Sequence, residues 1–281
     1  MNKLPPLLAS KLDGKNFESD QEQINAAKEI VQEVALLALS RAGIFQHAAF
    51  QGGTAFRICY DLDRFSEDLD FALIRPNKDF DLRQLLEPLK EEFEHWGLSL
   101  EAIDKSKINT TVRKAFLKKN SLGALLTLGL PLQKDQKLTV KLEVDTNPPR
   151  GARVESKLCH FPTDFQVVCH DPTTMFAGKL HALLARSYQK GRDWYDFVEY
   201  LRRAVSPNLT FLHAALEQIT PKDLKSIPNK ITKEWLIQRL KKRITALNIN
   251  KLREDVEPFV DNNEKLSLWS RAFFLAKLDT L

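Results

Sequence analysis

The sequence predicts an α+β fold, a mixed sheet with flanking helices followed by a C-terminal domain made only of helices. Two observations support this prediction. Before residue 160, segments with strand periodicity mix with helical segments, whereas after Pro172 the pattern is almost entirely helical. The chain also has 281 residues, 43% of them hydrophobic, which is enough for a substantial core. We place the boundary within 154–171 and expect domains at 1–160 and 161–281.

The first part begins with a predicted helix over Asp20–Arg41, in which apolar residues recur every three or four positions. Asp20 can cap this helix, and Gly43 can end it. The following segment, AAFQGGTAFRICYDL, has the pattern of a short strand, a glycine turn and a short helix. A helix is expected at Leu82–Trp96, and strands are expected at Leu69–Ile74, Leu98–Ile103, Gly123–Leu132 and Leu138–Val144.

Helical periodicity dominates the second part of the chain. Pro148, Pro149 and Gly151 end the last predicted strand before it. The predicted helices are Thr173–Ser187, Asp193–Ala204, Leu209–Gln218, Lys233–Leu247 and Glu264–Leu278.

Positive charge is concentrated in two stretches, although the net charge is only +5. Between Pro221 and Arg253 the sequence has ten Lys or Arg residues against Asp223 and Glu234. The second stretch comprises Lys105, Lys107, Arg113, Lys114, Lys118 and Lys119. Such clusters attract the phosphates of nucleic acids, so RNA is a candidate partner, and a solvated helix face is the alternative interpretation.

The composition argues against a secreted or membrane protein. Three cysteines are too few for a disulfide framework, and they lack the CxxC spacing of zinc sites. No run of about 18 apolar residues indicates a membrane helix. Prolines also interrupt the N-terminal segment before a secretory signal could form. We therefore expect a cytoplasmic protein with no membrane partner.

Asp68 and Asp70 are the first candidate catalytic residues. Residues i and i+2 of a strand project from the same face, so two carboxylates there can share divalent metal ions. Their neighbours Leu69 and Phe71 are apolar and are expected to face the core. A surface strand with paired acids is the alternative.

Gly52, Gly53 and Thr54 form the second candidate element. Glycines allow backbone amides to approach a phosphate, and the start of a helix adds partial positive charge. The Thr54 hydroxyl can donate to a phosphate oxygen. In the alternative interpretation, the segment is an ordinary strand-to-helix turn with Thr54 as the N-cap residue.

The strand LTVKLEVDTN supplies a third acid, because Glu143 and Asp145 lie on one face. Nucleotidyl transfer with two metal ions requires about three carboxylates around the ions. Lys141 shares this face, so a solvated polar strand edge is the alternative.

The last element is helical. Lys179 lies within the apolar stripe of its helix, where it either extends past the core or enters a cleft that holds an anion. Arg186 follows on the same side, and Asp193 and Asp196 come shortly after it. Alternatively, Asp193 only begins the next helix as an N-terminal acid.

Together these elements resemble the AbiEii-type toxin family of nucleotidyltransferases, which belongs to the DNA polymerase β-like superfamily. The resemblance is carried by FQGGTAFRICYDLDRFSEDLDFAL, KLEVDTN and KLHALLARSYQKGRDWYDF, and it spans about residues 50–200. It implies a polymerase β-like nucleotidyltransferase core followed by a helical domain. It also implies NTP as substrate, Mg²⁺ (or Mn²⁺) as cofactor, and a cognate antitoxin as partner.

The resemblance implies roles for the candidate residues. Asp68 and Asp70 would bind the metal, and Glu143 would complete the site, with Asp145 as the other match for this acid. Asp193 would be the essential acid of the last motif, with Asp196 as its alternative. The remaining residues would contact the nucleotide: Gly52, Gly53, Thr54, Ser66, Lys179, Arg186 and Asp196.

The leading hypothesis is an enzyme that transfers a nucleoside monophosphate from an NTP to RNA, with the 3′ end of tRNA as the acceptor that the resemblance favours. Lys179 and Arg186 would stabilise the leaving pyrophosphate. One alternative is transfer to a protein hydroxyl. Another is a catalytically silent protein of the same fold that binds RNA or a protein partner.

Overall fold

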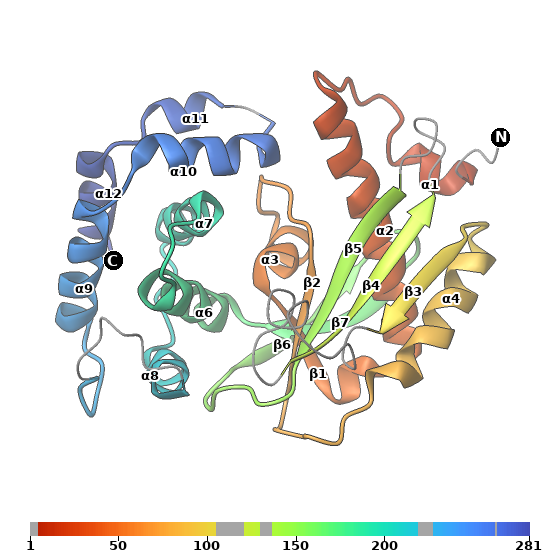
Figure 1. Ribbon diagram of the computed structural model, residues 1–281, viewed down its shortest axis with the longest axis horizontal. Helices are drawn as coiled ribbons and strands as arrows, with labels where there is room; N and C mark the ends of the chain where they lie inside the picture. The colour runs from red at the N-terminus through yellow and green to blue at the C-terminus, as the bar shows by residue number, and fades with distance from the viewer. Residues whose placement is uncertain (1–4, 105–120, 130–136, 219–226, 262) are drawn as a thin grey trace. The chain divides into compact units, whose positions relative to one another are not determined.

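The computed structural model describes residues 5–104, 121–129, 137–218, 227–261 and 263–281 (Figure 1). It forms two compact units, and each unit is assembled from several chain segments. Unit 1 comprises Met1–Asp61, Phe65–Pro148 and Glu155–Cys169. Unit 2 comprises Leu62–Arg64, Pro149–Val154 and His170–Leu281. The fold is α+β, as the sequence predicts, with strands in unit 1 and a helical C-terminal part.

Unit 1 contains a seven-stranded mixed sheet in the order β3-β4-β5-β2-β1-β7-β6. The strands are β1 (Ala48–Gln51), β2 (Leu69–Leu73), β3 (Leu100–Asp104), β4 (Ser121–Gly129), β5 (Lys137–Asp145), β6 (Val154–Cys159) and β7 (Phe165–His170). Strands β2 and β5 are parallel, as are β1 and β7, while β1 pairs with β2 antiparallel. The centre of the sheet therefore carries β2 between β1 and β5.

Helices α2 (Asp20–Arg41) and α4 (Leu86–His95) pack against each other in unit 1, and Figure 1 shows α2 behind β5, which it contacts. Helix α2 has the predicted bounds, and Gly43 follows its end with a φ of +79°. Its cap was wrongly predicted. Ser19 is the N-cap residue and accepts the Glu22 amide, because an oxygen outside the helix is needed to accept from its first turn.

The segment before β2 also has the predicted order, a short strand followed by α3 (Gly52–Tyr60). Among the described elements of unit 1, α1 (Pro6–Ser10) and η1 (Ile44–Gln46) were not predicted, whereas η2 (Leu82–Leu85) forms the first turn of the helix expected at Leu82–Trp96. Strand β4 covers most of the strand predicted at Gly123–Leu132, whose last residues lie outside the described part of the chain, as does the basic stretch of residues 105–119.

Strands β6 and β7 were missed, because this segment was interpreted as a boundary. Phe165, Val167 and Cys169 are buried at alternate positions of β7, and Cys169 lies opposite Phe50 of β1. The predicted division at residue 160 falls between these two strands.

Unit 2 is built around α6 (Pro172–Ala185) and α7 (Gly191–Arg202), with α8, α9 and α10 lying around them in Figure 1. The other elements are α8 (Leu209–Gln218), α9 (Lys233–Thr245), α10 (Ile249–Val256), η3 (Glu257–Phe259), α11 (Glu264–Ser267) and α12 (Arg271–Leu278). The single helix predicted at Glu264–Leu278 is wrong. Trp269 turns into the core, with 3% of its surface exposed, and Ser270 caps a new helix.

Candidate active site

Unit 1 places carboxylates on two neighbouring strands. In the parallel pair β2 and β5, Asp70 lies opposite Glu143, whereas Asp145 lies opposite Ala72. Adjacent strands are about 4.8 Å apart, so Asp70 and Glu143 leave the sheet side by side. The register therefore puts Glu143, rather than Asp145, next to Asp70.

Glu143 is buried, with 6% of its surface exposed, and its Oε2 lies 2.9 Å from Nζ of Lys141. A solvated strand edge, the alternative interpretation of this face, would leave such a carboxylate in water. Asp145 makes a local contact instead, since its Oδ1 accepts the Asn147 amide at 2.9 Å in the turn after β5. Glu143 is thus better placed than Asp145 to bind a cation together with Asp70.

Gly52 lets the Asp70 carboxylate lie against the start of α3. Its φ is +83°, a conformation that side chains other than glycine rarely adopt. A Cβ atom at Gly52 would lie 2.7 Å from Oδ2 of Asp70, so any larger residue would displace this carboxylate. The glycine turn and the acidic strand, which the sequence treats as two motifs, are therefore in direct contact.

Thr54 fixes the backbone before β2. Its side chain is buried, and its Oγ1 donates to the carbonyl oxygen of Asp68 at 2.5 Å. Because α3 begins at Gly52 with Gln51 as its N-cap residue, the interpretation of Thr54 as the N-cap is wrong. The hydroxyl that was expected to donate to a phosphate is used here on the segment that carries Asp68.

Ser66 is also held from α2. Its carbonyl oxygen accepts a hydrogen bond from Nε2 of Gln32 at 2.9 Å. The side chains of Ser66 and Asp68 are half-buried, as is Gly53. Two hydrogen bonds to carbonyl groups, from Gln32 and Thr54, thus position the segment that enters β2.

Unit 2 brings together the four residues predicted from its helices. Nζ of Lys179 lies 2.8 Å from Oδ1 of Asp193 and 2.8 Å from Oδ2 of Asp196. Arg186, the C-cap residue of α6, pairs with the second oxygen of Asp193. Asp193 is also an acid in the first turn of α7, so the alternative interpretation as an N-terminal acid holds as well.

Arg64 completes this cluster, although its role was not predicted from the sequence. Its Nε and Nη2 donate to the two oxygens of Asp196 at 2.6 and 2.7 Å, and the two side chains are only 3% and 1% exposed. The partners are 132 positions apart, so no local pattern could reveal the pair. The only available signal was the presence of an arginine four residues before Asp68.

The cluster is ionised near neutral pH. Burial alone would raise the pKa of Asp193, but the charges of Lys179 and Arg186 outweigh it and lower the pKa to about 2. Burial also works against the charge on Asp196, yet Arg64 and Lys179 lower its pKa. The two aspartates in turn outweigh the burial of Lys179 and raise its pKa.

The basic stretch of unit 2 divides into structural and exposed residues. Arg243 donates to the carbonyl oxygens of Leu183 and Arg186, which caps the end of α6. Arg253 donates to the carbonyl oxygens of Ser267 and Trp269. The exposed members are Lys230, Lys233, Lys241, Lys242 and Lys251, whereas Lys222 and Lys225 lie outside the described residues.

Asp70 and Glu143 have the chemistry that a magnesium ion requires. Magnesium prefers oxygen ligands, and one or two carboxylates together with substrate phosphates hold it in many phosphoryl-transfer sites. Within the described ranges, no three His, Cys, Asp or Glu side chains form a metal-binding group. The approach of Asp70 to Gly52, beside Glu143, fits a site of two carboxylates that the substrate completes.

The fold and these contacts agree with a comparison to known protein families. A sequence model described as "Nucleotidyl transferase AbiEii toxin, Type IV TA system" matches residues 34–277. The chain belongs to the AbiEii nucleotidyltransferase toxin family. It is therefore a nucleotidyltransferase of a toxin–antitoxin type, and the family implies an NTP substrate and an antitoxin partner.

Solved structures share the AbiEii fold at low sequence identity. A protein of H. pylori described as a candidate nucleotidyltransferase has 18% identity and a TM-score of 0.51, with 92% of each chain covered. The protein JHP933 from Helicobacter pylori has 17% identity and a TM-score of 0.50, with 92% of this chain and 89% of that chain covered. No curated protein matches the sequence significantly.

Two parts of the prediction have different outcomes. The sequence correctly predicted the AbiEii family and its core fold. The convergence of the unit 1 carboxylates and the unit 2 ion cluster on one cleft stays a prediction.

None of the helices that the structure describes is long and apolar enough to cross a membrane.

Proposed function

We propose that this AbiEii protein uses Mg²⁺ or Mn²⁺ to transfer a nucleoside monophosphate from an NTP to the 3′ end of an RNA, with tRNA as the expected acceptor. The observation that supports this most strongly is the placement of Asp70 opposite Glu143 and against the turn at Gly52. A cytoplasmic location and a cognate antitoxin encoded nearby follow from the same proposal.

Asp70 and Glu143, together with Asp68, would hold the divalent ion. When bound, the ion would neutralise the triphosphate and lower the pKa of the attacking hydroxyl. In the reaction, the acceptor oxygen forms a bond to the α-phosphorus, the bond to pyrophosphate breaks, and the hydroxyl proton passes to water. Thr54 and Gly52 have positioning roles, since they fix the backbone of Asp68 and make room for the Asp70 carboxylate.

Lys179 and Arg186 would stabilise the negative charge on the leaving pyrophosphate. Asp193 holds both cations, which fits its proposed essential role. Asp196 was predicted to bind the nucleotide, but its two oxygens already pair with Arg64 and Lys179. We assign Asp196 a positioning role, in which it fixes Lys179.

The exposed lysines of α9 and its neighbours support an RNA acceptor. Lys233, Lys241 and Lys242 project from α9 into solvent, where they can neutralise backbone phosphates. Arg243 and Arg253 are excluded from this role because carbonyl groups of unit 2 engage them. Arg239 of α9 is half-buried and lies over the Trp235 ring, so we assign the acceptor surface to the exposed lysines.

Incorporation of α-labelled NTPs tests the proposal. Each of the four NTPs is supplied with Mg²⁺ and total RNA to the wild type, to Asp70→Asn and to Asp79→Asn, whose aspartate is exposed in the loop after β2. We expect label in RNA with at least one NTP, its loss in Asp70→Asn, and its retention in Asp79→Asn. Label found only in protein would support the protein hydroxyl as acceptor, and no label with any NTP would support a catalytically silent protein.

A further inference from the structure

Tyr188 is a large aromatic residue that unit 2 holds out into solvent. It lies in the loop between α6 and α7, and 61% of its surface is exposed. Its ring also lies 5.8 Å from the guanidinium carbon of Arg186, which pairs with Asp193. Tyr188 therefore presents an exposed, flat aromatic face next to a cation, and such a face can stack on a planar ligand.

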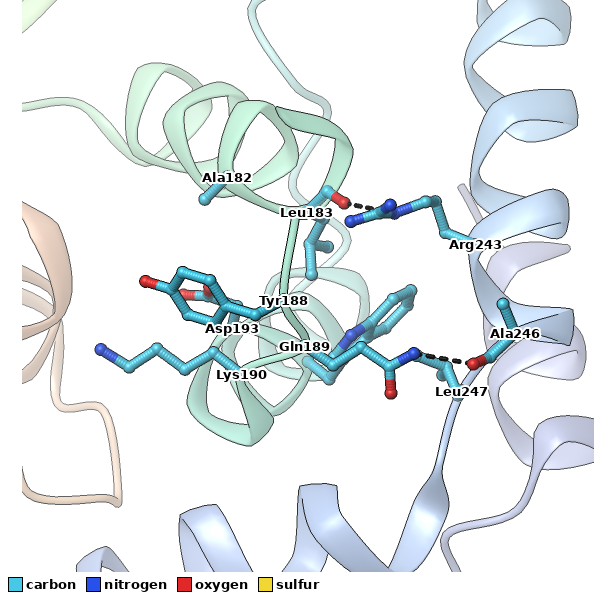
Figure 2. A pocket seen from close by; sticks show the side chains of 10 residues that line it. Ala182, Leu183, Tyr188, Gln189, Lys190, Asp193, Arg243, Ala246 and Leu247 are labelled. Carbon is cyan, nitrogen blue, oxygen red and sulfur yellow. Dashed lines mark hydrogen bonds between the residues drawn. The ribbon is translucent and has the colours of Figure 1, made fainter. Parts of the chain in front are cut away.

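The loop that carries Tyr188 is fixed from α9 and the residues that follow it. Gln189 donates to the carbonyl oxygen of Ala246 at 2.7 Å and accepts the Asn248 amide at 2.9 Å. Arg243 donates to the carbonyl oxygen of Leu183 at 2.9 Å, as Figure 2 shows, and also to that of Arg186. A ligand that binds Tyr188 would therefore meet a loop that is already ordered, which lowers the entropic cost of binding.

The pocket behind this loop is too small for a nucleobase. It has a volume of about 30 Å³ and is lined by the loop with Tyr188 and Lys190, by residues of α6 and α7 such as Asp193, and by Arg243 of α9 with the two residues after this helix. A volume of this size holds about two water molecules. In Figure 2, the side chains of Tyr188, Asp193 and Lys190 point to the same side, away from α9. A flat ligand would thus lie on the exposed face of the ring, outside the pocket.

The charges beside Tyr188 favour an anion. Lys190 is partly buried, and burial together with the nearby Arg192, Arg186 and Lys179 lowers its pKa, although Asp193 opposes this effect. Two acids, Asp193 and Asp196, lie among four cations, which are Arg64, Lys179, Arg186 and Lys190, so positive charges outnumber negative ones. A phosphate placed there would relieve the repulsion among the cations.

We propose that Tyr188 is a stacking platform for a nucleobase, and that Lys190 binds the phosphate next to this base. The proposal rests on the nucleotidyl-transfer function above and adds the part of the substrate that unit 2 recognises. The base belongs either to the NTP or to the unpaired end of the acceptor RNA. Both present the same flat ring with an adjoining phosphate, which is the chemistry that an aromatic residue flanked by cations binds.

Fluorescence quenching of 2-aminopurine tests the proposal, because stacking quenches this base. One probe is 2-aminopurine riboside triphosphate, and the other is a short single-stranded RNA with 2-aminopurine at its 3′ end; each is titrated alone. The variants are Tyr188→Leu, which removes the ring, and Tyr188→Phe, which keeps it. Leu268→Ala is the control, since Leu268 is a 66% exposed apolar residue elsewhere in unit 2.

We expect Tyr188→Leu to weaken the binding of one probe by about 5-fold to 100-fold, the range of a lost base–aromatic stack. Tyr188→Phe and Leu268→Ala should bind within about twofold of the wild type, because the first retains the ring and the second is distant from it. The probe that is affected identifies whether the NTP or the RNA supplies the base.

The inference is overturned if Tyr188→Leu binds both probes like the wild type, or if the wild type quenches neither. Its failure is distinguishable from failure of the proposed function, since probe binding is measured without transfer. If the wild type labels RNA and Tyr188→Leu binds both probes as tightly as the wild type does, only the stacking platform is refuted. If the wild type labels neither RNA nor protein, but Tyr188→Leu binds a probe more weakly than the wild type does, only the proposed reaction is refuted.

Discussion

Replacing Arg64 with methionine tests the ion cluster most severely. Arg64 donates two hydrogen bonds to Asp196, and both side chains are almost completely buried. Methionine has a similar length but no charge, so the variant would leave Asp196 in the core without this partner. Removing one member of a buried ion pair typically costs 3–5 kcal/mol of unfolding free energy.

We expect the cost of Arg64→Met to be near 3 kcal/mol, the lower end of that range, because Lys179 remains 2.8 Å from Asp196 and compensates for part of its charge. Replacing both partners, as in Arg64→Met with Asp196→Leu, should cost clearly less than the single change, since no buried charge is then left alone. Arg83 offers a matched control. It pairs with Asp81 at the surface of unit 1, with 54% of its side chain exposed, and we expect no measurable loss in Arg83→Met.

Urea unfolding followed by tryptophan fluorescence measures these differences in unit 2. Three of the four tryptophans, Trp194, Trp235 and Trp269, lie in that unit, and Trp194 and Trp269 are buried in its core. A shift in the midpoint without a change in slope would report stability alone. If Arg64→Met unfolds at the same urea concentration as Arg83→Met, the reasoning on the buried pair is refuted.

Three further predictions follow from single residues. Gly52→Ala should lower the rate of transfer by about 100-fold, because the added Cβ displaces the Asp70 carboxylate. Gly14→Ala is the control and should keep the rate, since Gly14 has a similar φ of +73° but a Cβ added there meets no atom within 4 Å. Equal losses of rate in the two variants would contradict the mechanism. Burial lowers the pKa of His170 to about 4, against the opposing effect of Asp171. The unfolded chain therefore binds the proton first, so stability falls by roughly 3 kcal/mol as pH drops from 6.5 to 4, and His170→Gln should flatten this dependence in unfolding experiments at several pH values. Lys242→Ala should reduce the slope of log affinity for single-stranded RNA against log salt by about 0.7, and an unchanged slope would exclude this lysine from the acceptor surface.

Local sequence patterns predicted most elements of the AbiEii fold. Helix α2 was predicted with its bounds because its periodic apolar residues end at a glycine suited to a positive φ. The break before α12 was missed, since Leu268 and Trp269 continue a helical pattern although only Trp269 is buried. Strands β6 and β7 were missed because prolines and a glycine dominate the preceding segment, while the pairing of β7 with β1 joins residues far apart in the sequence.

The sequence predicted the candidate residues of the site better than their contacts. Strand alternation correctly places Glu143 and Asp145 on one face, but only the register with β2 distinguishes them. Likewise, helical spacing singled out Lys179, but it could not show that Arg64 holds Asp196 beside it. Both distinctions depend on pairing between distant segments, which a single sequence does not contain.

The rates of NMP transfer in Glu143→Gln and Asp145→Asn, with Asp70→Asn alongside, test the central claim most directly. Because Glu143 lies opposite Asp70 and Asp145 does not, we predict that Glu143→Gln and Asp70→Asn lose at least about 100-fold in rate, while Asp145→Asn stays within about tenfold. An inactive Asp145→Asn beside an active Glu143→Gln would contradict the assignment of the metal site, and an active Asp70→Asn would contradict the catalytic account itself.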